Sequence, residues 1–185
     1  MSGYCDFAPG HALHGPYHDD EYGFPLTGDD ALFERLLLEI NQAGLSWELM
    51  LKKREGFRAA YAGFSVAKVA RFGAKDTARL LADAGIVRNR LKVAAAIHNA
   101  NVILALAKSH GSFGAWIAAH HPLTKKEWCK VFAKTFKFTG GEIVGEFLMS
   151  VGYLPGAHRD TCPAYKRIAK RNPPWMKAAK KGFVY

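Results

Sequence analysis

The sequence predicts an all-α protein, and two observations support that prediction. Apolar residues recur at helical spacings along most of the chain, as in Leu32, Leu36 and Ile40. Alternating apolar and polar stretches, which would indicate β-strands, are nearly absent. The 185 residues are enough for one compact domain and too few for several independent ones. We therefore expect roughly eight to ten helices joined by short connections.

The limits of the predicted helices follow from capping residues and glycines. Thr27 or Asp29 could cap the first long helix, Ser46 could cap the second, and Thr124 with Glu127 forms a capping-box motif. Glycines close behind several helices mark their ends, and two consecutive prolines interrupt the tail. The helices themselves are predicted over residues 32–40, 46–57, 75–84, 88–109, 124–136 and 141–151.

Composition excludes several classes of protein. The chain is 49% hydrophobic and 23% charged, which is ordinary globular usage and excludes disorder of the whole chain. Since no uncharged apolar run approaches about 18 residues, no membrane span is expected. Met1–Gly15 lacks the basic start and apolar stretch of a secretory signal, and three cysteines are too few for a disulfide scaffold. We expect a cytoplasmic protein in a reducing compartment.

Positive charge is the first indication of a partner. The net charge is +10, and seven of these charges fall between Pro163 and Tyr185, where no acid occurs. Such a balance suits a polyanion, above all nucleic acid. A solvated basic surface accounts for the tail equally well.

Two cysteines and two histidines near the chain ends form a candidate metal site. His158 and Cys162 have a His-x-x-x-Cys spacing that lets both reach one ion, and Cys5 and His18 lie near the other end. Two thiolates and two imidazoles are a ligand set that zinc prefers. Alternatively, Cys5 and Cys162 are ordinary buried thiols. Cys129, within a predicted helix, is expected to be a packed core thiol.

A carboxylate and an aromatic residue flank a predicted turn. Glu39 stands among apolar residues near a helix end, where a carboxylate is costly unless it is exposed, paired or functional. Gly44 allows a sharp turn, on which Leu45 could act as an apolar wedge. The alternative is a simple helix–loop–helix corner with Leu45 and Trp47 in the core.

Several sequence blocks together resemble the 3-methyladenine DNA glycosylase I family. They stand in family order over residues 5–162, whereas the tail beyond Cys162 is not covered. The blocks are Tyr17–Gly23, Leu38–Trp47, Leu51–Glu55, Asp83–Arg90 with Lys92, Phe136–Gly140, Phe147, Val151–Gly152, His158 and Cys162.

The resemblance implies a helix-hairpin-helix DNA-repair enzyme with one structural zinc ion per chain, bound by Cys5, His18, His158 and Cys162. It implies that Gly85–Arg90 is the hairpin that holds a phosphate, and that Gly44 and Leu45 fill the gap left by an extruded nucleotide. Lys52, Lys53, Arg88, Arg90 and Lys92 are the expected basic residues of the DNA-binding surface. The expected base pocket contains Glu39 as the catalytic residue, with Tyr17, Trp47, Tyr22, Phe7 and His14.

The expected organisation is a single domain over residues 1–185. It consists of a hairpin-containing core over 28–139, two zinc-stapled segments over 1–27 and 140–162, and a basic tail over 163–185. We expect a monomer, not bound to membranes, that acts on double-stranded DNA with alkylated bases. Its reaction is hydrolysis of the N-glycosidic bond of 3-methyladenine without a Schiff base. The alternative is a non-catalytic DNA-binding or damage-sensing protein on the same scaffold.

Some residues depart from the family pattern. Phe7 and Tyr22 stand where the family commonly has tryptophan, and His14 stands where it has an aromatic residue. Gly145 and Glu146 replace what is often a tyrosine followed by a small residue. We expect these differences to change the shape and hydrogen bonding of the base pocket.

Overall fold

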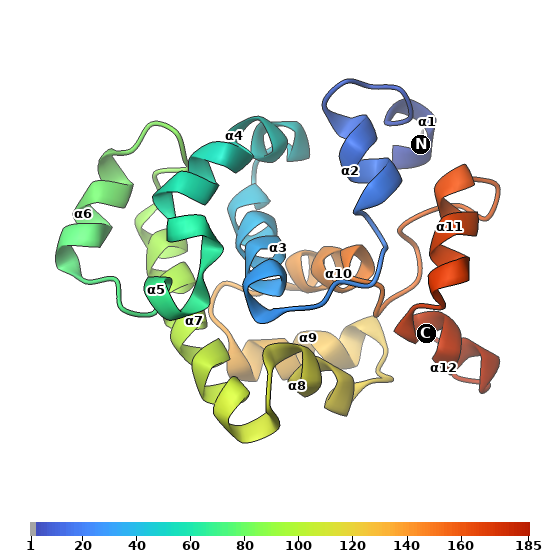
Figure 1. Ribbon diagram of the computed structural model, residues 1–185. Helices are drawn as coiled ribbons and strands as arrows, with labels where there is room; N and C mark the ends of the chain where they lie inside the picture. The colour runs from blue at the N-terminus through green and yellow to red at the C-terminus, as the bar shows by residue number, and fades with distance from the viewer. Residues whose placement is uncertain (1–2) are drawn as a thin grey trace.

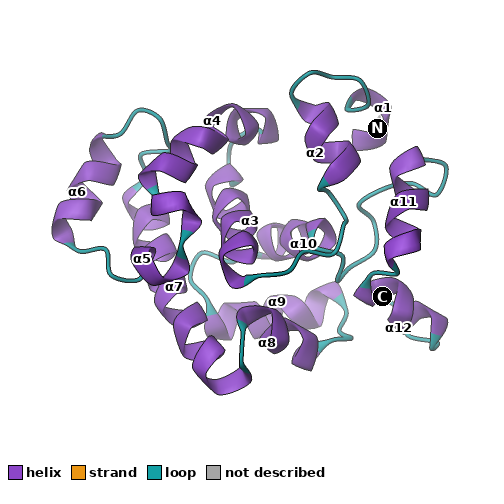
Figure 2. Ribbon diagram, in the orientation of Figure 1, coloured by secondary structure: helices purple, strands orange, loops and turns teal. Residues whose placement is uncertain are grey.

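The computed structural model describes residues 3–185, so Met1 and Ser2 of the expected N-terminal segment lie outside it. Within this range the chain forms twelve α-helices and one 3₁₀-helix, without a strand, which confirms the all-α prediction (Figures 1 and 2). More helices form than expected, because several are too short to give a periodic pattern. They are α1 Tyr4–Phe7, α2 His14–Asp20, α3 Asp29–Gln42, α4 Trp47–Ala60, η1 Ala62–Phe64, α5 Val66–Val69, α6 Ala74–Ala82, α7 Arg90–His110, α8 Phe113–His120, α9 Lys125–Thr135, α10 Gly141–Ser150, α11 Pro163–Arg171 and α12 Pro174–Lys180.

Helix α3 is the central element, packed against α4, α7, α8 and α10 (Figure 1). The prediction that Thr27 or Asp29 caps it is wrong, because its N-cap is Gly28 and no side chain caps it. Asp29 instead accepts a 2.9 Å hydrogen bond from the backbone N–H of Phe113, at the start of α8. Asp30 accepts one of 2.8 Å from Val66, at the start of α5. These two acids therefore fix the beginnings of neighbouring helices to α3.

The turn between α3 and α4 has the predicted geometry. Gly44 has φ +79°, and Ser46 caps α4 by accepting a 3.2 Å hydrogen bond from the N–H of Leu49. Leu45 is 39% exposed, so it is not the core residue that the alternative interpretation required. The turn therefore presents an apolar side chain to solvent.

A short loop joins α6 to α7 and packs closely on α4. Asn89 caps α7 through hydrogen bonds from the N–H groups of Leu91 and Lys92. At Gly56 of α4, an added Cβ would lie 2.5 Å from the carbonyl oxygen of Gly85, so only glycine permits this approach. Lys53 reinforces it by donating a 2.7 Å hydrogen bond to the carbonyl of Ala84.

The core extends beyond the predicted boundary at residue 139. Helix α10 packs against both α3 and α9, and it contributes Val144, Phe147 and Leu148 to the main cluster of buried residues. The capping box at the start of α9 is confirmed, since Thr124 and Glu127 hydrogen-bond each other's backbone N–H groups. Cys129 of α9 is only half-buried, so it lies at the edge of the core and not inside it as predicted.

The basic tail is folded rather than extended. Helix α11 packs against α2 and buries Ala164 and Ile168, and α12 buries Met176 (Figure 1). Arg167 donates a 2.9 Å hydrogen bond to Asp20, the last residue of α2. The tail therefore has an apolar face on the body of the protein and a basic face in solvent.

Helix α7 bears on the expectation that the chain has no membrane span. By length and composition alone it is long and apolar enough to cross a membrane. Its contacts with α3, α5, α6 and α8 are those of a helix in a packed bundle, and Val93, Ala96 and Ala100 are buried there. A core helix of this kind meets the same criterion.

Candidate active site and metal site

A cavity of about 390 Å³ opens where α1, α2, α3, α4 and α10 converge. Its lining combines aromatic rings with carboxylates, and we call it the acidic cavity. The residues that line it are Tyr4, Tyr17, Tyr22, Glu39, Gln42, Trp47, Glu142 and Glu146.

Aromatic rings form the walls of the acidic cavity. The ring centroids of Tyr17 and Trp47 are 4.8 Å apart, and those of Tyr17 and Tyr22 are 5.7 Å apart. The indole Nε1 of Trp47 is buried and has no hydrogen-bond partner among residues 3–185. Flat walls with an unused donor suit a planar ligand that carries an acceptor.

Glu39 is the most deeply buried acid of the cavity, with 3% of its surface exposed. Burial raises its pKa to about 8, repulsion from Glu146 adds to the rise, and attraction to Arg35 opposes it. A carboxyl group whose charge is so poorly solvated is typical of a functional site.

An ion-pair network beneath the cavity fixes Tyr17. The guanidinium of Arg35 is buried and donates hydrogen bonds of 2.9 Å to the Tyr17 hydroxyl and 3.0 Å to Glu21. Arg54 donates two more to Glu21, of 2.6 and 2.8 Å. Such multiple charge-assisted bonds give Tyr17 a defined position and orientation.

Glu146 is held by an aromatic side chain on the opposite side of the cavity. The hydroxyl of Tyr22 donates a 2.9 Å hydrogen bond to Glu146, and burial raises the pKa of Glu146 above its ordinary value. The neighbouring Gly145 faces Lys125, whose Cε would lie 2.6 Å from an added Cβ. The lysine chain thus occupies the space that a side chain at position 145 would need.

Four of the predicted pocket residues line the cavity: Glu39, Tyr17, Tyr22 and Trp47. Phe7 and His14 do not, which corrects their expected place in the pocket lining. Phe7 is 51% exposed and packs edge-on against Tyr4. His14 is buried, with its Nδ1 3.1 Å from the Tyr4 hydroxyl. Both therefore support a lining residue rather than facing the cavity.

Sequence reasoning missed three lining residues: Tyr4, Gln42 and Glu142. It identified Glu146 only as a departure from the family pattern that changes the pocket. Spacing could have placed Gln42 and the two acids. Gln42 follows Glu39 by three residues on α3, and Glu142 and Glu146 are four apart on α10, so each pair shares a helix face. Tyr4 precedes the candidate ligand Cys5, but only the fold shows where it points.

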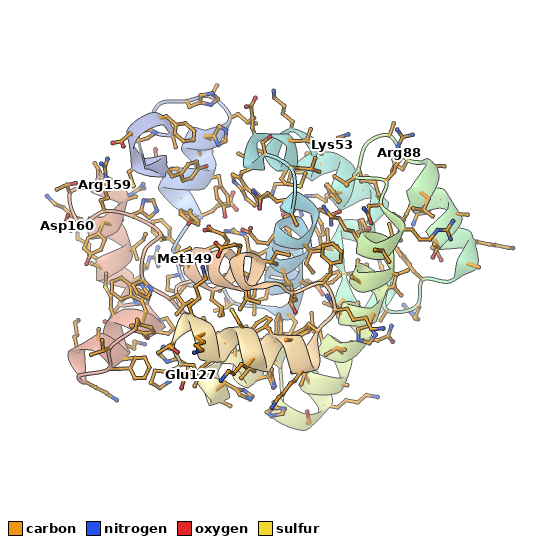
Figure 3. The ribbon with its side chains drawn as sticks, turned by 180° about the vertical axis from the view of Figure 1, so that it is seen from behind. Lys53, Arg88, Glu127, Met149, Arg159 and Asp160 are labelled. Atoms are coloured by element: carbon orange, nitrogen blue, oxygen red, sulfur yellow. The ribbon has the colours of Figure 1, made fainter. Side chains whose placement is uncertain are left out.

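Basic side chains gather beside the α3–α4 turn and the α6–α7 loop. Lys53 on α4 and Arg88 in the loop lie on the same side of the molecule (Figure 3). Lys52, Gly85, Arg88 and Arg90 are exposed, and Lys52 pairs with Glu48 at 2.5 Å.

Lys92 departs from the expected role of a phosphate contact. It is 5% exposed, and its Nζ donates hydrogen bonds of 2.8 Å to the carbonyl of Asn41 and 2.7 Å to that of Ala43. A buried ammonium engaged by two carbonyls acts inside the protein, where it supports the α3–α4 turn.

The structure brings the four candidate metal ligands together. The ligand atoms of Cys5, His18, His158 and Cys162 all lie within 4.8 Å of one another. Cys162 Sγ is 3.5 Å from His158 Nδ1 and 3.8 Å from His18 Nε2, and Cys5 Sγ is 3.6 Å from His158 Nδ1. Tetrahedral zinc with ordinary bond lengths separates sulfur and nitrogen ligands by about 3.6 Å, so the cluster has the right size.

The second ring nitrogen of each histidine is also engaged. His18 Nδ1 is 2.7 Å from the carboxylate of Asp19, and His158 Nε2 is 2.8 Å from the carbonyl oxygen of Tyr22. Metal-bound histidines are usually oriented in this way. The residues present can therefore hold a metal ion between the two ends of the chain.

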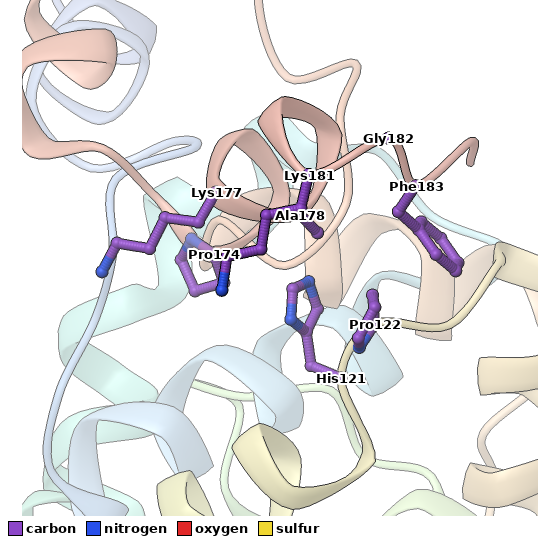
Figure 4. A pocket seen from close by; sticks show the side chains of 8 residues that line it. All are labelled: His121, Pro122, Pro174, Lys177, Ala178, Lys181, Gly182 and Phe183. Atoms are coloured by element: carbon purple, nitrogen blue, oxygen red, sulfur yellow. The ribbon is translucent and has the colours of Figure 1, made fainter.

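A second cavity, of about 560 Å³, lies between α12 and the α8–α9 connection (Figure 4). Its polar lining residues are His121, Lys177 and Lys181, the other lining residues are apolar, and no acid lines it. It contains none of the residues predicted for the site.

Comparisons with known proteins identify relatives of this chain. Residues 8–134 match the model of a family described as methyladenine glycosylase. A DNA-3-methyladenine glycosylase of Haemophilus influenzae is 34% identical over 88% of this chain and 98% of its own. DNA-3-methyladenine glycosylase 1 of Escherichia coli is 43% identical over 59% and 58% of the two chains.

A solved structure gives the same result for the fold. The structure of 3-methyladenine DNA glycosylase I from Staphylococcus aureus, described as showing 3-methyladenine recognition, is 31% identical to this chain. It superposes with a TM-score of 0.77, over 87% of this chain and 95% of the other. The family match over residues 8–134 and the similarity to relatives along nearly the whole chain lead to one assignment: the chain belongs to the methyladenine glycosylase family.

Proposed function

We propose that this protein is a DNA-3-methyladenine glycosylase, which draws an alkylated adenine out of duplex DNA and hydrolyses its N-glycosidic bond. The observation that carries the proposal is the burial of Glu39 beside Tyr17 and Trp47 in a cavity of base size. Relatives that cover nearly the whole chain bear this name.

The reaction follows from the charge of the substrate. Adenine alkylated at N3 is cationic in DNA and leaves readily, because the electron pair of the broken C1′–N9 bond neutralises it. Glu39 stabilises positive charge on the base and the developing sugar cation, while Tyr17 and Trp47 stack on the base. Water then adds to C1′ and loses a proton. No lysine lines the acidic cavity, in keeping with hydrolysis without a Schiff base.

The DNA-binding surface adjoins the cavity in this proposal. Leu45, exposed on the α3–α4 turn, fills the gap left by the extruded nucleotide. The α6–α7 segment acts as the helix-hairpin-helix element, whose backbone N–H groups near Gly85 hold a phosphate. Arg88, Arg90 and Lys53 add positive charge around it.

Zinc is the proposed occupant of the Cys5, His18, His158 and Cys162 cluster, at one ion per chain. Four protein ligands complete a tetrahedral shell, so the ion has a structural role and no open position for substrate. We place the protein in the cytoplasm as a monomer, where DNA is accessible and thiols stay reduced.

Release of 3-methyladenine from methylated duplex DNA by the purified protein tests the function. We expect a stoichiometry above one base per protein, and slower release by Glu39→Gln. Tight binding of methylated DNA without release of any base would contradict the proposal and favour the damage-sensing alternative.

A further inference from the structure

Glu146 has no part in the mechanism given above, yet it faces the same cavity as Glu39. Its one hydrogen-bond partner among residues 3–185 is the hydroxyl of Tyr22, and none of the ion pairs in this range includes Glu146 or Glu39. The cavity therefore contains two carboxyl groups, partly or fully buried, without a bonded cation.

Such an arrangement is unfavourable in the empty protein. Removing a carboxylate from water is costly unless a positive charge compensates, and two carboxylates in one cavity repel each other. Repulsion from Glu146 raises the pKa of Glu39 further than burial alone does. A positively charged ligand would relieve both effects at once.

Lys125 forms no ion pair with Glu146, and its attraction lowers the pKa of Glu146 less than burial raises it. The Nζ of Lys125 pairs with Glu142 at 3.0 Å, and Glu142 is 87% exposed at the outer edge of α10. The aliphatic part of Lys125 covers Gly145 and closes this side of the helix. Apart from the Tyr22 hydroxyl, Glu146 has no bonded partner among residues 3–185, so its carboxyl group remains available to a ligand in the cavity.

We propose that Glu146 is a second acidic recognition residue, held in place by Tyr22, and that it makes the acidic cavity selective for purine bases with a positive charge. The class of ligand is the N-alkylated, cationic purine, preferred over a neutral purine of similar shape. The inference rests on the proposed function, because it specifies which bases that site accepts. Tyr22 is a positioning residue in this arrangement.

Binding of two small bases tests the inference without DNA. The probes are 3,9-dimethyladeninium, a permanent cation, and 3-methyladenine, which is neutral as a free base at neutral pH. We expect the protein to prefer the cation. Glu146→Gln keeps the size and hydrogen bonding of the side chain, and should reduce that preference about five- to tenfold through lost charge attraction. Affinity for neutral 3-methyladenine should change less than about twofold.

Three further variants separate charge from structure. Glu146→Asp retains the charge and should restore most of the preference if Glu146→Gln folds poorly. Tyr22→Phe should reduce the preference partly, since the carboxylate remains without its hydrogen bond. Glu55→Gln removes an acid that is 81% exposed on α4 and should leave the preference unchanged.

Two results would overturn the inference. One is an equal loss of affinity for both bases in Glu146→Gln, which would make Glu146 a purely structural support of Tyr22. The other is the absence of any preference for the cation in the unaltered protein. Failure of the proposed function is distinct from both, because it appears as intact cation preference without release of base from methylated DNA.

Discussion

The ammonium of Lys92 lies 2.7 Å from the carbonyl oxygen of Ala43, so the first turn of α7 is bonded directly to the end of α3. The last carbonyls of a helix lack partners within it, and they attract a positive charge. Lys92 satisfies two of them and thereby fixes the turn that carries Leu45. A basic residue that the sequence predicts for a DNA-binding surface is instead bonded inside the protein, where it supports the α3–α4 turn.

Lys92→Met should therefore reduce stability and base release without removing a phosphate contact. We expect a loss of about 1–3 kcal/mol, because two buried carbonyls lose their donor. The slope of DNA affinity against salt concentration should stay the same. Thermal unfolding and salt titrations of DNA binding check both statements, with exposed Arg90→Met as the control that lowers the slope and spares stability.

Neutralising the cations around the α6–α7 loop should weaken DNA binding regardless of sequence. In the triple variant Lys53→Gln, Arg88→Gln and Arg90→Gln, up to three phosphate contacts are lost, and the salt slope should fall by about 0.9 for each. Fluorescence anisotropy at several salt concentrations measures the slope. An unchanged slope would show that DNA contacts another face.

Glu39→Gln should slow base release while duplex affinity stays near normal, because the lost charge acts mainly on the cationic base and the developing sugar cation. Since a cationic base leaves readily, we expect a reduced rather than abolished single-turnover rate. Equal rates for the two proteins at saturating concentration would remove Glu39 from catalysis.

The same substitution should stabilise the protein at mildly alkaline pH. Burial raises the pKa of Glu39 from 4.5 to about 8, so the unfolded chain loses this proton at lower pH than the folded chain. Stability due to Glu39 consequently falls as pH rises from about 4.5 to about 8. Glu39→Gln removes that loss, and its melting temperature should exceed that of the unaltered protein near pH 8 and converge with it near pH 5. A constant difference across this range would mean that Glu39 ionises normally.

Substituting a metal ligand should weaken the attachment between the N-terminal and C-terminal segments of the chain. Cys162→Ala should lower zinc content from one ion per chain towards none and lower the melting temperature markedly. Elemental analysis and thermal unfolding measure the two effects, with Cys129→Ala as the control that keeps the metal. Metal-free protein of unchanged stability would exclude a structural role for zinc.

Truncation after Cys162 should now affect stability as well as charge, because α11 buries Ile168 against the body of the protein. We expect a lower melting temperature, in contrast to a simple basic arm. Replacing Lys177, Lys180 and Lys181 with glutamine removes charge without removing packing. DNA affinity of that variant at low salt measures whether the tail touches DNA, and unchanged affinity would leave it a structural element only.

The helices that the sequence predicts are those whose signals are local. Ser46 and Thr124 cap as predicted, because an N-cap depends only on the next three residues. Asp29 does not, because its carboxylate has a partner far along the chain, at Phe113. Likewise, Lys92 is buried and Arg90 is exposed because one face of α7 meets α3. No spacing in the sequence reveals which face that is.

The residues of the acidic cavity also divide into those with a local signal in the sequence and those placed by tertiary packing. Glu39 stands out in the sequence as an acid among apolar residues, whereas Glu146 lies on a helix whose facing direction is set by packing against α3 and α9. Phe7 and His14 share the aromatic character of pocket residues, but the rings pack around Tyr4 in an order that only the tertiary structure decides.

The ligand cluster between residue 5 and residue 162 also sets the order of events during synthesis. The four candidate ligands can come together only after His158 and Cys162 have left the ribosome. Tyr4 and Tyr17 stand next to the two early ligands, so the aromatic wall of the cavity is completed only when nearly the whole chain has been made. A chain that ends before His158 therefore lacks two of the four candidate ligands, and the segment that carries Tyr4 and Tyr17 lacks its attachment to the other end of the chain.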